Sequence, residues 1–427
     1  MKKLFNYNSN ILSFLIKNTL YLFIELIIIC IYATKLLSLL IKSNLFSKFS
    51  NSKKIQTKRN YLKIIIFKSG NLGDHLIAID CLNFIQKKYD VKAAWIICKG
   101  SSKYNDLVKL GKYHNVNIYD YWDFLKLIPE ISRGNFIIID TQQKFRLALL
   151  ISFLKGDNIF ISLKNSFIDN FLKRYFRNIR IFKYNENNLE GKVLFDLITS
   201  GINAIREINI SNKEKDYLFN IYQKTFLKIS VPKINNGFLS FHDGVIKKFS
   251  NKKQSIYLYY GTSGKAIHRL APFNWFKGLL RDLIEDFNIF LVGGKSEIAL
   301  INNLNSELYS SSELINKFNV EEWSVILSNS KYKLPLLAFD GGFSHLYGIH
   351  SPYLFQIFCS SNSNKWRNKS NKAFVYDCLE GGSPNYKPHL FKVPDYCKYA
   401  EKAWEETHPN SVSLSFRKWV KKLKINN

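Results

Sequence analysis

Residues 61–74 read YLKIIIFKSGNLGD, a short apolar run that ends in a glycine-containing turn. The residues that follow, HLIAIDCLNFIQKK, have the apolar spacing of a helix. A β-branched run that passes through a glycine turn into a helix is typical of an α/β sheet, which presents backbone N–H groups at its carboxyl edge. We therefore expect a strand, a turn and a helix here, with Asp74 in the first helical turn.

Asp74 has two interpretations. As a first-turn carboxylate it is stabilised by the helix dipole and needs no further role. As an acid at the binding edge of a sheet it can instead act as a general base. The spacing by itself leaves both interpretations open.

Similar patterns recur along the chain. Apolar runs predict further strands at 91–98, 136–140, 255–260, 288–292, 333–339 and 352–358. In the second half, helices are predicted at 272–284 and 296–304, and glycine turns follow the strands as GTSGK (261–265), GG (293–294) and DGG (340–342). Strands that alternate with helices form parallel βαβ units, and ligands bind at the carboxyl ends of such strands.

The predicted fold class is therefore α/β, with two Rossmann-like, doubly wound domains that face a cleft. We expect four segments, which are an N-terminal hydrophobic helix and basic linker (1–60), a first domain (61–235), a second domain (236–394) and a helical tail (395–427).

The composition limits the partners. The chain has 427 residues, enough for two domains, and its six cysteines contain no CxxC pair, so we expect neither a disulfide framework nor a metal site. The net charge of +29 is compatible with three kinds of anionic partner, which are nucleic acid, a membrane surface and anionic substrates. Because the lysines are dispersed and no nucleic-acid-binding module is recognised, we expect no nucleic acid and favour an anionic membrane surface or a phosphorylated substrate.

Residues 20–41 (LYLFIELIIICIYATKLLSLLI) form a long apolar stretch. Its length is sufficient to span a bilayer, but Glu25 and Lys35 interrupt it. A helix in the membrane interface, a single span and an ordinary packed helix all remain open. Each keeps the later residues in the cytoplasm, so we expect the cytoplasmic face of the inner membrane, with peripheral or single-pass attachment through residues 20–41.

Five elements of the chain, in order, resemble the motifs of glycosyltransferase family 9, the ADP-heptose:lipopolysaccharide heptosyltransferase family. They are Leu72-Gly73-Asp74, Asp140 to Leu154, Gly261 to Trp275, Leu291 to Glu297 and Asp340 to His345. A lone glycine turn is weak support, and it is the ordered set that carries the resemblance. It implies the GT-B architecture, in which two Rossmann-like domains face a cleft.

Three features depart from the family pattern. Gly341 stands where the family has Ser or Thr, so that a phosphate contact there would have to come from backbone N–H groups. His268 stands where the family usually has lysine, although Arg269 follows it. The first 60 residues have no counterpart in the minimal enzyme. The first two departures leave the donor sugar open.

The resemblance implies a nucleotide-sugar and phosphate site in the second domain, formed by Gly261, Thr262, Ser263, Lys265, Arg269, Glu297, Asp340, Gly341, Gly342 and His345. Hydroxyl and N–H groups of the turns can hold phosphate oxygens, and the cations supply charge. Structural roles remain open for several of them. Glu297 can be a first-turn carboxylate, Asp340 can stabilise its turn, and His345 can be an ordinary helical histidine.

The resemblance implies Asp74 as the catalytic base and places Gly70, Gly73 and Arg146 on the acceptor side. Asp80, further along the same helix, is expected at the surface. No cofactor and no metal are expected, because no DxD-like pair of acids stands at a strand end.

The resemblance thus favours an inverting glycosyltransferase that moves a heptose-like sugar from a nucleoside-diphosphate donor, similar to ADP-heptose, to a lipopolysaccharide core or another lipid-linked glycan. One alternative is a catalytically silent relative that binds nucleotide or glycolipid as a scaffold, since Gly341 and His268 weaken the phosphate site. An NAD-dependent dehydrogenase is less favoured, because the first turn lacks the GxGxxG spacing.

Overall fold

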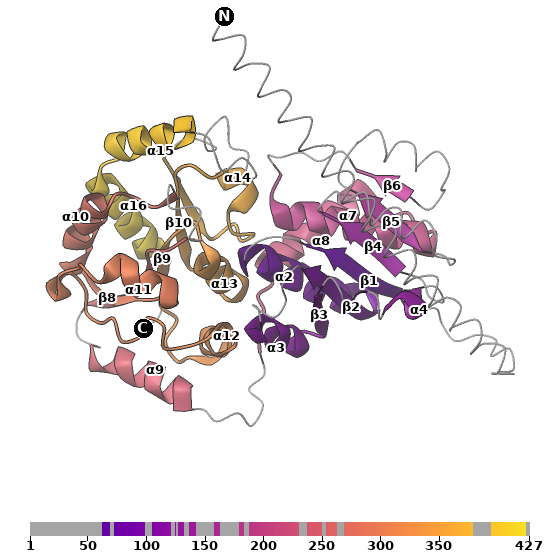
Figure 1. Cartoon of the computed structure of the whole chain (residues 1–427), viewed down its shortest axis with the longest axis horizontal. Helices are drawn as coiled ribbons and strands as arrows, with labels where there is room; N and C mark the ends of the chain where they lie inside the picture. Colours follow the sequence, from indigo (N-terminus) through magenta and orange to yellow (C-terminus); the bar gives the residue numbers. More distant parts are fainter. Residues whose placement is uncertain are drawn as a thin grey trace, which may run out of the picture.

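The computed structural model contains two parallel sheets, one in each half of the chain (Figure 1). It describes residues 62–68, 72–98, 105–120, 124, 127–131, 136–141, 158–162, 179–182, 188–229, 237–249, 253–262, 269–378 and 394–423. The apolar stretch 20–41, the expected domain boundary near residue 235, and Gly70, Arg146, Ser263 and Lys265 lie outside these residues. Of the helices within them, none combines the length and apolarity needed to cross a bilayer.

The first sheet has the strand order β3-β2-β1-β4-β5-β6. Its strands are β1 (Leu62–Phe67), β2 (Val91–Cys98), β3 (Val116–Asp120), β4 (Phe136–Asp140), β5 (Ile159–Ser162) and β6 (Ile179–Ile181). The order changes direction between β1 and β4, which pair in parallel. In open α/β sheets this point, at the carboxyl ends of the strands, is where ligands bind. Lys68 directly follows β1 there.

The helices of this half are α2 (Leu72–Tyr89), α3 (Asn105–Tyr113), α4 (Ile128–Ile131), α7 (Glu190–Arg206) and α8 (Asn212–Lys224). Successive side chains of a strand point to opposite faces, and Ile64 and Ile66 of β1 share one buried cluster with α2 and α7. The face of the sheet that carries Ile64 and Ile66 therefore packs against α2 and α7. The first turns of these two helices contain Asp74 and Glu190.

The second sheet has the order β11-β10-β9-β7-β8. Its strands are β7 (Gln254–Tyr259), β8 (Phe287–Leu291), β9 (Leu336–Phe339), β10 (Leu354–Phe358) and β11 (Phe374–Asp377). Here the order changes direction between β7 and β9. Gly261-Thr262 follows β7 and Asp340-Gly341 follows β9, so the two expected phosphate turns meet at this point.

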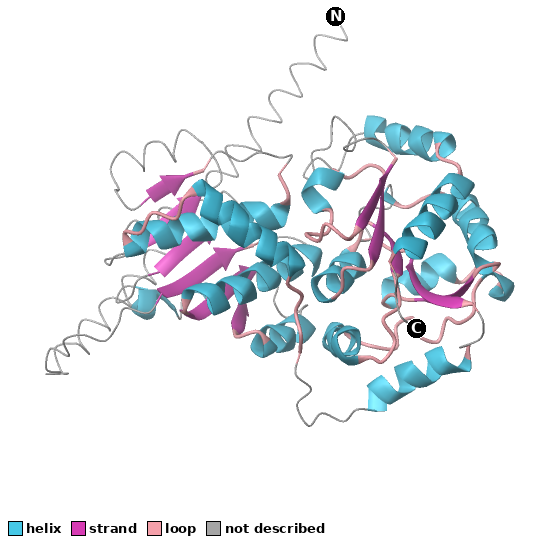
Figure 2. Ribbon diagram, turned by 180° about the vertical axis from the view of Figure 1, so that it is seen from behind, coloured by secondary structure: helices cyan, strands magenta, loops and turns pink. Residues whose placement is uncertain are grey.

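Helices cover both faces of the second sheet (Figure 2). They are α9 (Gly237–Lys248), α10 (Phe273–Ile284), α11 (Lys295–Ile301), α12 (Val320–Asn329), α13 (Gly342–His350), α14 (Ser363–Trp366), α15 (Pro394–Glu406) and α16 (Pro409–Lys422). Successive side chains of β7 point to opposite faces of the sheet and belong to two different buried clusters. Tyr257 and Tyr259 join α12 and α13, whereas Ile256 and Leu258 join α10 and α16. This is the doubly wound arrangement expected from the alternating pattern.

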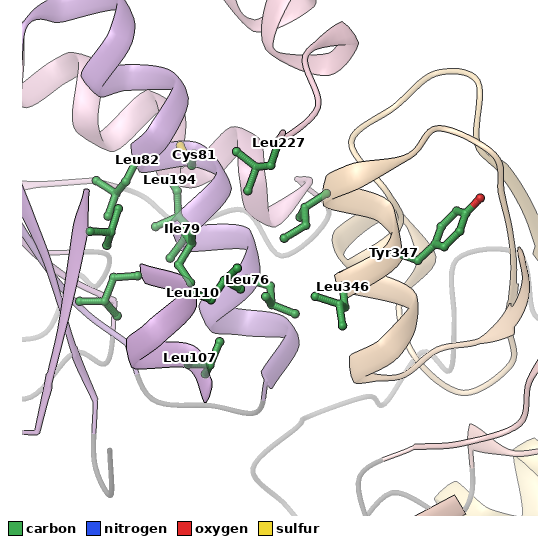
Figure 3. Close-up of a cluster of buried hydrophobic side chains, with 14 of the residues drawn as sticks. Leu76, Ile79, Cys81, Leu82, Leu107, Leu110, Leu194, Leu227, Leu346 and Tyr347 are labelled. Carbon is green, nitrogen blue, oxygen red and sulfur yellow. The ribbon is translucent and has the colours of Figure 1, made fainter. Parts of the chain in front are cut away.

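The two halves are joined by helix packing. One buried cluster runs from the first sheet through α2 to α13 and the second sheet, and Leu76 of α2 faces Leu346 of α13 within it (Figure 3). Beside it α3 packs near α12, where the Tyr113 hydroxyl donates a hydrogen bond of 2.7 Å to Glu321. The contact between α2 and α13 brings the starts of these two helices together.

Candidate functional site

The starts of α2 and α13 touch across the two halves. A Cβ atom added to Gly73 would overlap the imidazole of His345, whose Cγ lies 3.0 Å from that position. A Cβ atom added to Gly342 would lie 3.3 Å from the Leu72 side chain. Two positive helix ends are therefore adjacent, which is favourable for an anionic ligand.

Asp74 lies in the first turn of α2, as expected, and its carboxylate has a buried cationic neighbour. The Lys68 ammonium is 3.5 Å from Asp74 Oδ1 and also donates a short hydrogen bond to Glu190 Oε1. Lys68 comes from the end of β1, Asp74 from the start of α2 and Glu190 from the start of α7. Three elements thus bring one cation and two acids together at the switch point of the first sheet.

Lys68 and Glu190, the two buried members of this group, both stay charged near neutral pH. Burial opposes the charged form of Lys68, but the carboxylates of Glu190 and Asp74 outweigh it and raise the lysine pKa. Burial also opposes the charged form of Glu190, yet Lys68 and Lys365 hold its pKa below the usual range.

Asp340 connects three other groups in the second half. Arg269 Nη1 donates to its Oδ2 at 3.2 Å, the Ser361 hydroxyl donates to the same oxygen at 2.5 Å, and His345 Nε2 lies 3.7 Å from Oδ1. Burial disfavours the charged carboxyl, but Arg269 and His345 outweigh it and lower the pKa of Asp340. The buried acid therefore orients Arg269 and His345, which agrees with the structural interpretation of Asp340.

The glycine at position 341 has a local cause. A Cβ atom there would lie 2.6 Å from the Gly261 carbonyl oxygen and 2.9 Å from the Tyr259 hydroxyl. The Ser or Thr of the family motif does not fit beside this tyrosine. The Gly341 N–H, which was expected to face phosphate, instead points at the Ser344 hydroxyl at 3.4 Å.

Glu297 is occupied within its own half. Its carboxylate accepts hydrogen bonds from the Gly294 N–H at 2.7 Å and the Ser296 hydroxyl at 2.8 Å, and it interacts with Tyr259. Burial raises the pKa of this carboxyl. These contacts form the cap of α11, so the first-turn interpretation of Glu297 accounts for its geometry.

Thr262 follows Gly261 at the end of β7 and is buried. Its hydroxyl oxygen is buried and has no hydrogen-bond partner among the described residues. A buried hydroxyl of this kind costs about 1–3 kcal/mol unless a ligand or water satisfies it. Thr262 is therefore a candidate contact for a polar ligand at this sheet edge.

The structure thus gathers most of the expected residues around the facing helix starts. Gly73, Asp74 and His345 meet there, Arg269 and Asp340 adjoin them, and Gly261, Thr262, Glu297, Gly341 and Gly342 surround the second turn. Lys68, Glu190 and Tyr259 had not been identified from the sequence. Lys68 carried the one available signal, a lysine that directly ends a buried strand.

Comparison with known proteins shows the fold. No protein-family model and no curated protein matches the chain. Among solved structures, the chain is similar to the ADP-heptose LPS heptosyltransferase II of E. coli, with 13% identity over 85% of this chain and 100% of that one and a TM-score of 0.54. It is also similar to a family 9 glycosyl transferase from Veillonella parvula, with 13% identity, coverage of 82% and 99%, and a TM-score of 0.51. The chain therefore has the fold of family 9 heptosyltransferases, a two-sheet fold that matches GT-B-like glycosyltransferases.

Proposed function

We propose that the protein is an inverting glycosyltransferase that moves a heptose-like sugar from a nucleoside-diphosphate donor to a lipid-linked glycan such as a lipopolysaccharide core. In the reaction, Asp74 takes the proton of the acceptor hydroxyl while the hydroxyl oxygen bonds to the anomeric carbon. The bond from that carbon to the diphosphate oxygen breaks, and the diphosphate leaves with the electron pair.

One observation carries the proposal. Asp74, a base candidate, lies at a helix start that contacts the start of α13, where Arg269 and His345 gather around Asp340. A proton acceptor thereby lies in the same region as the Arg269 guanidinium, which can stabilise a departing diphosphate. The buried hydroxyl of Thr262 at the same sheet edge, which has no hydrogen-bond partner within the described part of the chain, supports a polar ligand.

We extend the proposal to the location. A lipid-linked acceptor lies at a membrane surface, and both the net charge of +29 and the apolar stretch 20–41 favour attachment to an anionic membrane. The proposed site of action is the cytoplasmic face of the inner membrane.

A second candidate has its own support. The Gly341 N–H is directed at Ser344, and the Phe343 N–H is directed at Tyr259, so N–H groups at the start of α13 are already used. A protein that binds a nucleotide or glycolipid without turnover, and acts as a scaffold, is consistent with these contacts.

The two candidates differ in donor turnover. The full-length chain is titrated with ADP-, UDP- and GDP-sugars by thermal shift, and release of the nucleoside diphosphate is then followed. We expect one donor to bind and to be slowly hydrolysed, and Asp74→Asn to lose about 10²-fold or more in rate while keeping donor binding.

Asp106→Asn is the matched control, because Asp106 is also a first-turn carboxylate, on helix α3 of the same half. It should retain the rate of the wild type. Donor binding without turnover in the wild type would favour the scaffold. Equal rates for the wild type and Asp74→Asn would remove the base assignment.

A further inference from the structure

The Lys68 ammonium lies between two carboxylates from distant parts of the chain. Its side chain is 4% exposed, whereas that of Asp74 is 18% exposed, so the acid reaches solvent and the cation does not. Glu190 is 122 residues away in sequence and is itself buried. When two carboxylates share one buried ammonium, each carboxylate changes how strongly the ammonium acts on the other.

A lone ammonium beside a general base would have two opposite effects. It would orient the carboxylate and keep it deprotonated, but it would also weaken it as a proton acceptor. A second carboxylate on the same ammonium shares the positive charge and reduces the second effect. Glu190 is in the position to do this, because it accepts the hydrogen bond of the same Lys68 Nζ atom.

We propose that Lys68 and Glu190 are positioning residues for Asp74: the buried ammonium orients the base, and Glu190 limits how strongly that ammonium suppresses its proton affinity. This inference rests on the proposed glycosyl transfer, since it concerns the base of that reaction. Neither residue touches the acceptor hydroxyl or the donor in this scheme.

Other ionisable groups face this trio from neighbouring elements. His75 follows Asp74 on α2, His345 of α13 contacts Gly73 with Asp340 and Arg269 behind it, and Lys365 of α14 acts on Glu190. Burial lowers the pKa of His75 to about 4, so its ring is neutral at neutral pH. All five groups are present in every variant below, so their contributions are constant in the comparison.

The first test is the pH dependence of donor turnover by the whole chain between pH 3.5 and 9, a range that extends below the ordinary aspartate pKa of about 3.9. In Lys68→Met, loss of the cation disfavours the charged form of the base. The low-pH limb of the pH–rate profile should therefore move to higher pH by roughly one unit. In Glu190→Gln, Asp74 is the remaining carboxylate partner of Lys68 among the described residues, so the low-pH limb should move to lower pH. The double variant Lys68→Met/Glu190→Gln should have a low-pH limb close to that of the wild type. Lys68→Arg, which keeps the cation, should leave the limb where it is in the wild type.

Lys63→Met is the matched control. Lys63 lies within β1, whereas Lys68 follows it, and Lys63 pairs with Glu130 at 2.6 Å near the start of that strand, away from Asp74. It should leave the limb unchanged. A merely structural Lys68–Glu190 pair would lower the rates of both single variants without moving their limbs in opposite directions, and that result would overturn the proposal.

The second test does not depend on the reaction. In an Asp74→Cys background, the rate of alkylation by iodoacetamide is measured against pH, and adducts are assigned by peptide mass spectrometry. The thiol should react at higher pH when Lys68→Met is added and at lower pH when Glu190→Gln is added. If the pH dependence of alkylation does not change, or shifts in the same direction in both variants, the coupling is refuted. The expected shifts in a chain that turns over no nucleoside-diphosphate sugar would refute the transfer reaction while supporting the coupling.

Discussion

Asp80 of α2 and Lys369, which precedes β11, form a buried ion pair of 2.6 Å between residues 289 positions apart. The Tyr222 hydroxyl donates to the same Asp80 oxygen at 2.8 Å, and the Lys369 ammonium lies 4.1 Å from the centre of the Tyr222 ring. The expectation that Asp80 lies at the surface is therefore wrong, since the residue is 3% exposed. The pair joins the two halves behind the contact between α2 and α13.

Breaking this pair on one side should destabilise the protein. Burial is the largest influence on both partners, raising the pKa of Asp80 and lowering that of Lys369. Lys369→Met leaves the buried acid without its cation and should cost roughly 3–5 kcal/mol in the free energy of unfolding by urea. Asp80→Asn/Lys369→Met should recover most of this loss. Equal losses for the single and double variants would show that the charge pairing is not responsible.

Gly73→Ala tests the contact between the two helix starts. The added methyl overlaps the His345 ring, so α2 and α13 must separate, at a cost of roughly 1–3 kcal/mol and with loss of donor turnover. Gly244→Ala in α9 is the control, because nothing lies within 4 Å of its added Cβ; it should be neutral or stabilise by up to about 1 kcal/mol. Thermal unfolding and turnover measure both. If Gly73→Ala behaves like Gly244→Ala, the helix starts are not in close contact.

Gly341→Ser restores the residue type of the family motif but should harm this protein. The new Cβ would meet the Gly261 carbonyl at 2.6 Å, and a backbone atom cannot move aside as a side chain can. We expect a loss of roughly 1–3 kcal/mol in thermal unfolding. Gly342→Ser, whose nearest neighbour is the flexible Leu72 side chain at 3.3 Å, should lose less. A Gly341→Ser protein as stable as Gly342→Ser would contradict the crowding by the Gly261 carbonyl.

Three buried histidines predict a loss of stability in acid. Burial lowers the pKa of His75 and His114 to about 4 and that of His350 to about 3, from an ordinary value of 6.5. The unfolded chain therefore binds more protons than the folded chain below pH 6.5. Stability falls as the pH drops from 6.5 toward 4, and each histidine should cost about 2 kcal/mol at pH 5.

Urea unfolding of His114→Asn at pH 8, 7, 6 and 5 measures this effect. His114 Nδ1 forms a hydrogen bond of 3.2 Å with the Asn83 side chain, and the ring is buried. The variant should lose less stability between pH 7 and 5 than the wild type does. His408→Asn, at an exposed position before α16, should follow the wild-type curve. A His114→Asn curve parallel to that of the wild type would exclude His114 as a source of the acid sensitivity.

The alternating elements were predictable because they depend on neighbours in sequence. The seven strands expected from apolar runs and the helices expected after them occur within a few residues of their predicted bounds. Short strands such as β3 (VNIYD) and β11 (FVYD) were missed, because a run of only four or five residues gives little periodic signal. The glycine turns at 261–262 and 340–342 follow β7 and β9, as the sequence predicted.

The amino-acid sequence by itself determined the two α/β halves, the turns at their switch points and the position of Asp74 at a helix start. Only the tertiary structure decided which charges are buried and paired, as for Lys68 with Glu190 and Asp80 with Lys369, and why position 341 has no side chain. The physical reason is that periodicity is a property of neighbouring residues. The burial of a charge and the clash of a methyl group depend on segments more than 80 residues apart, such as Tyr259 and Gly341, which meet only when the chain has folded.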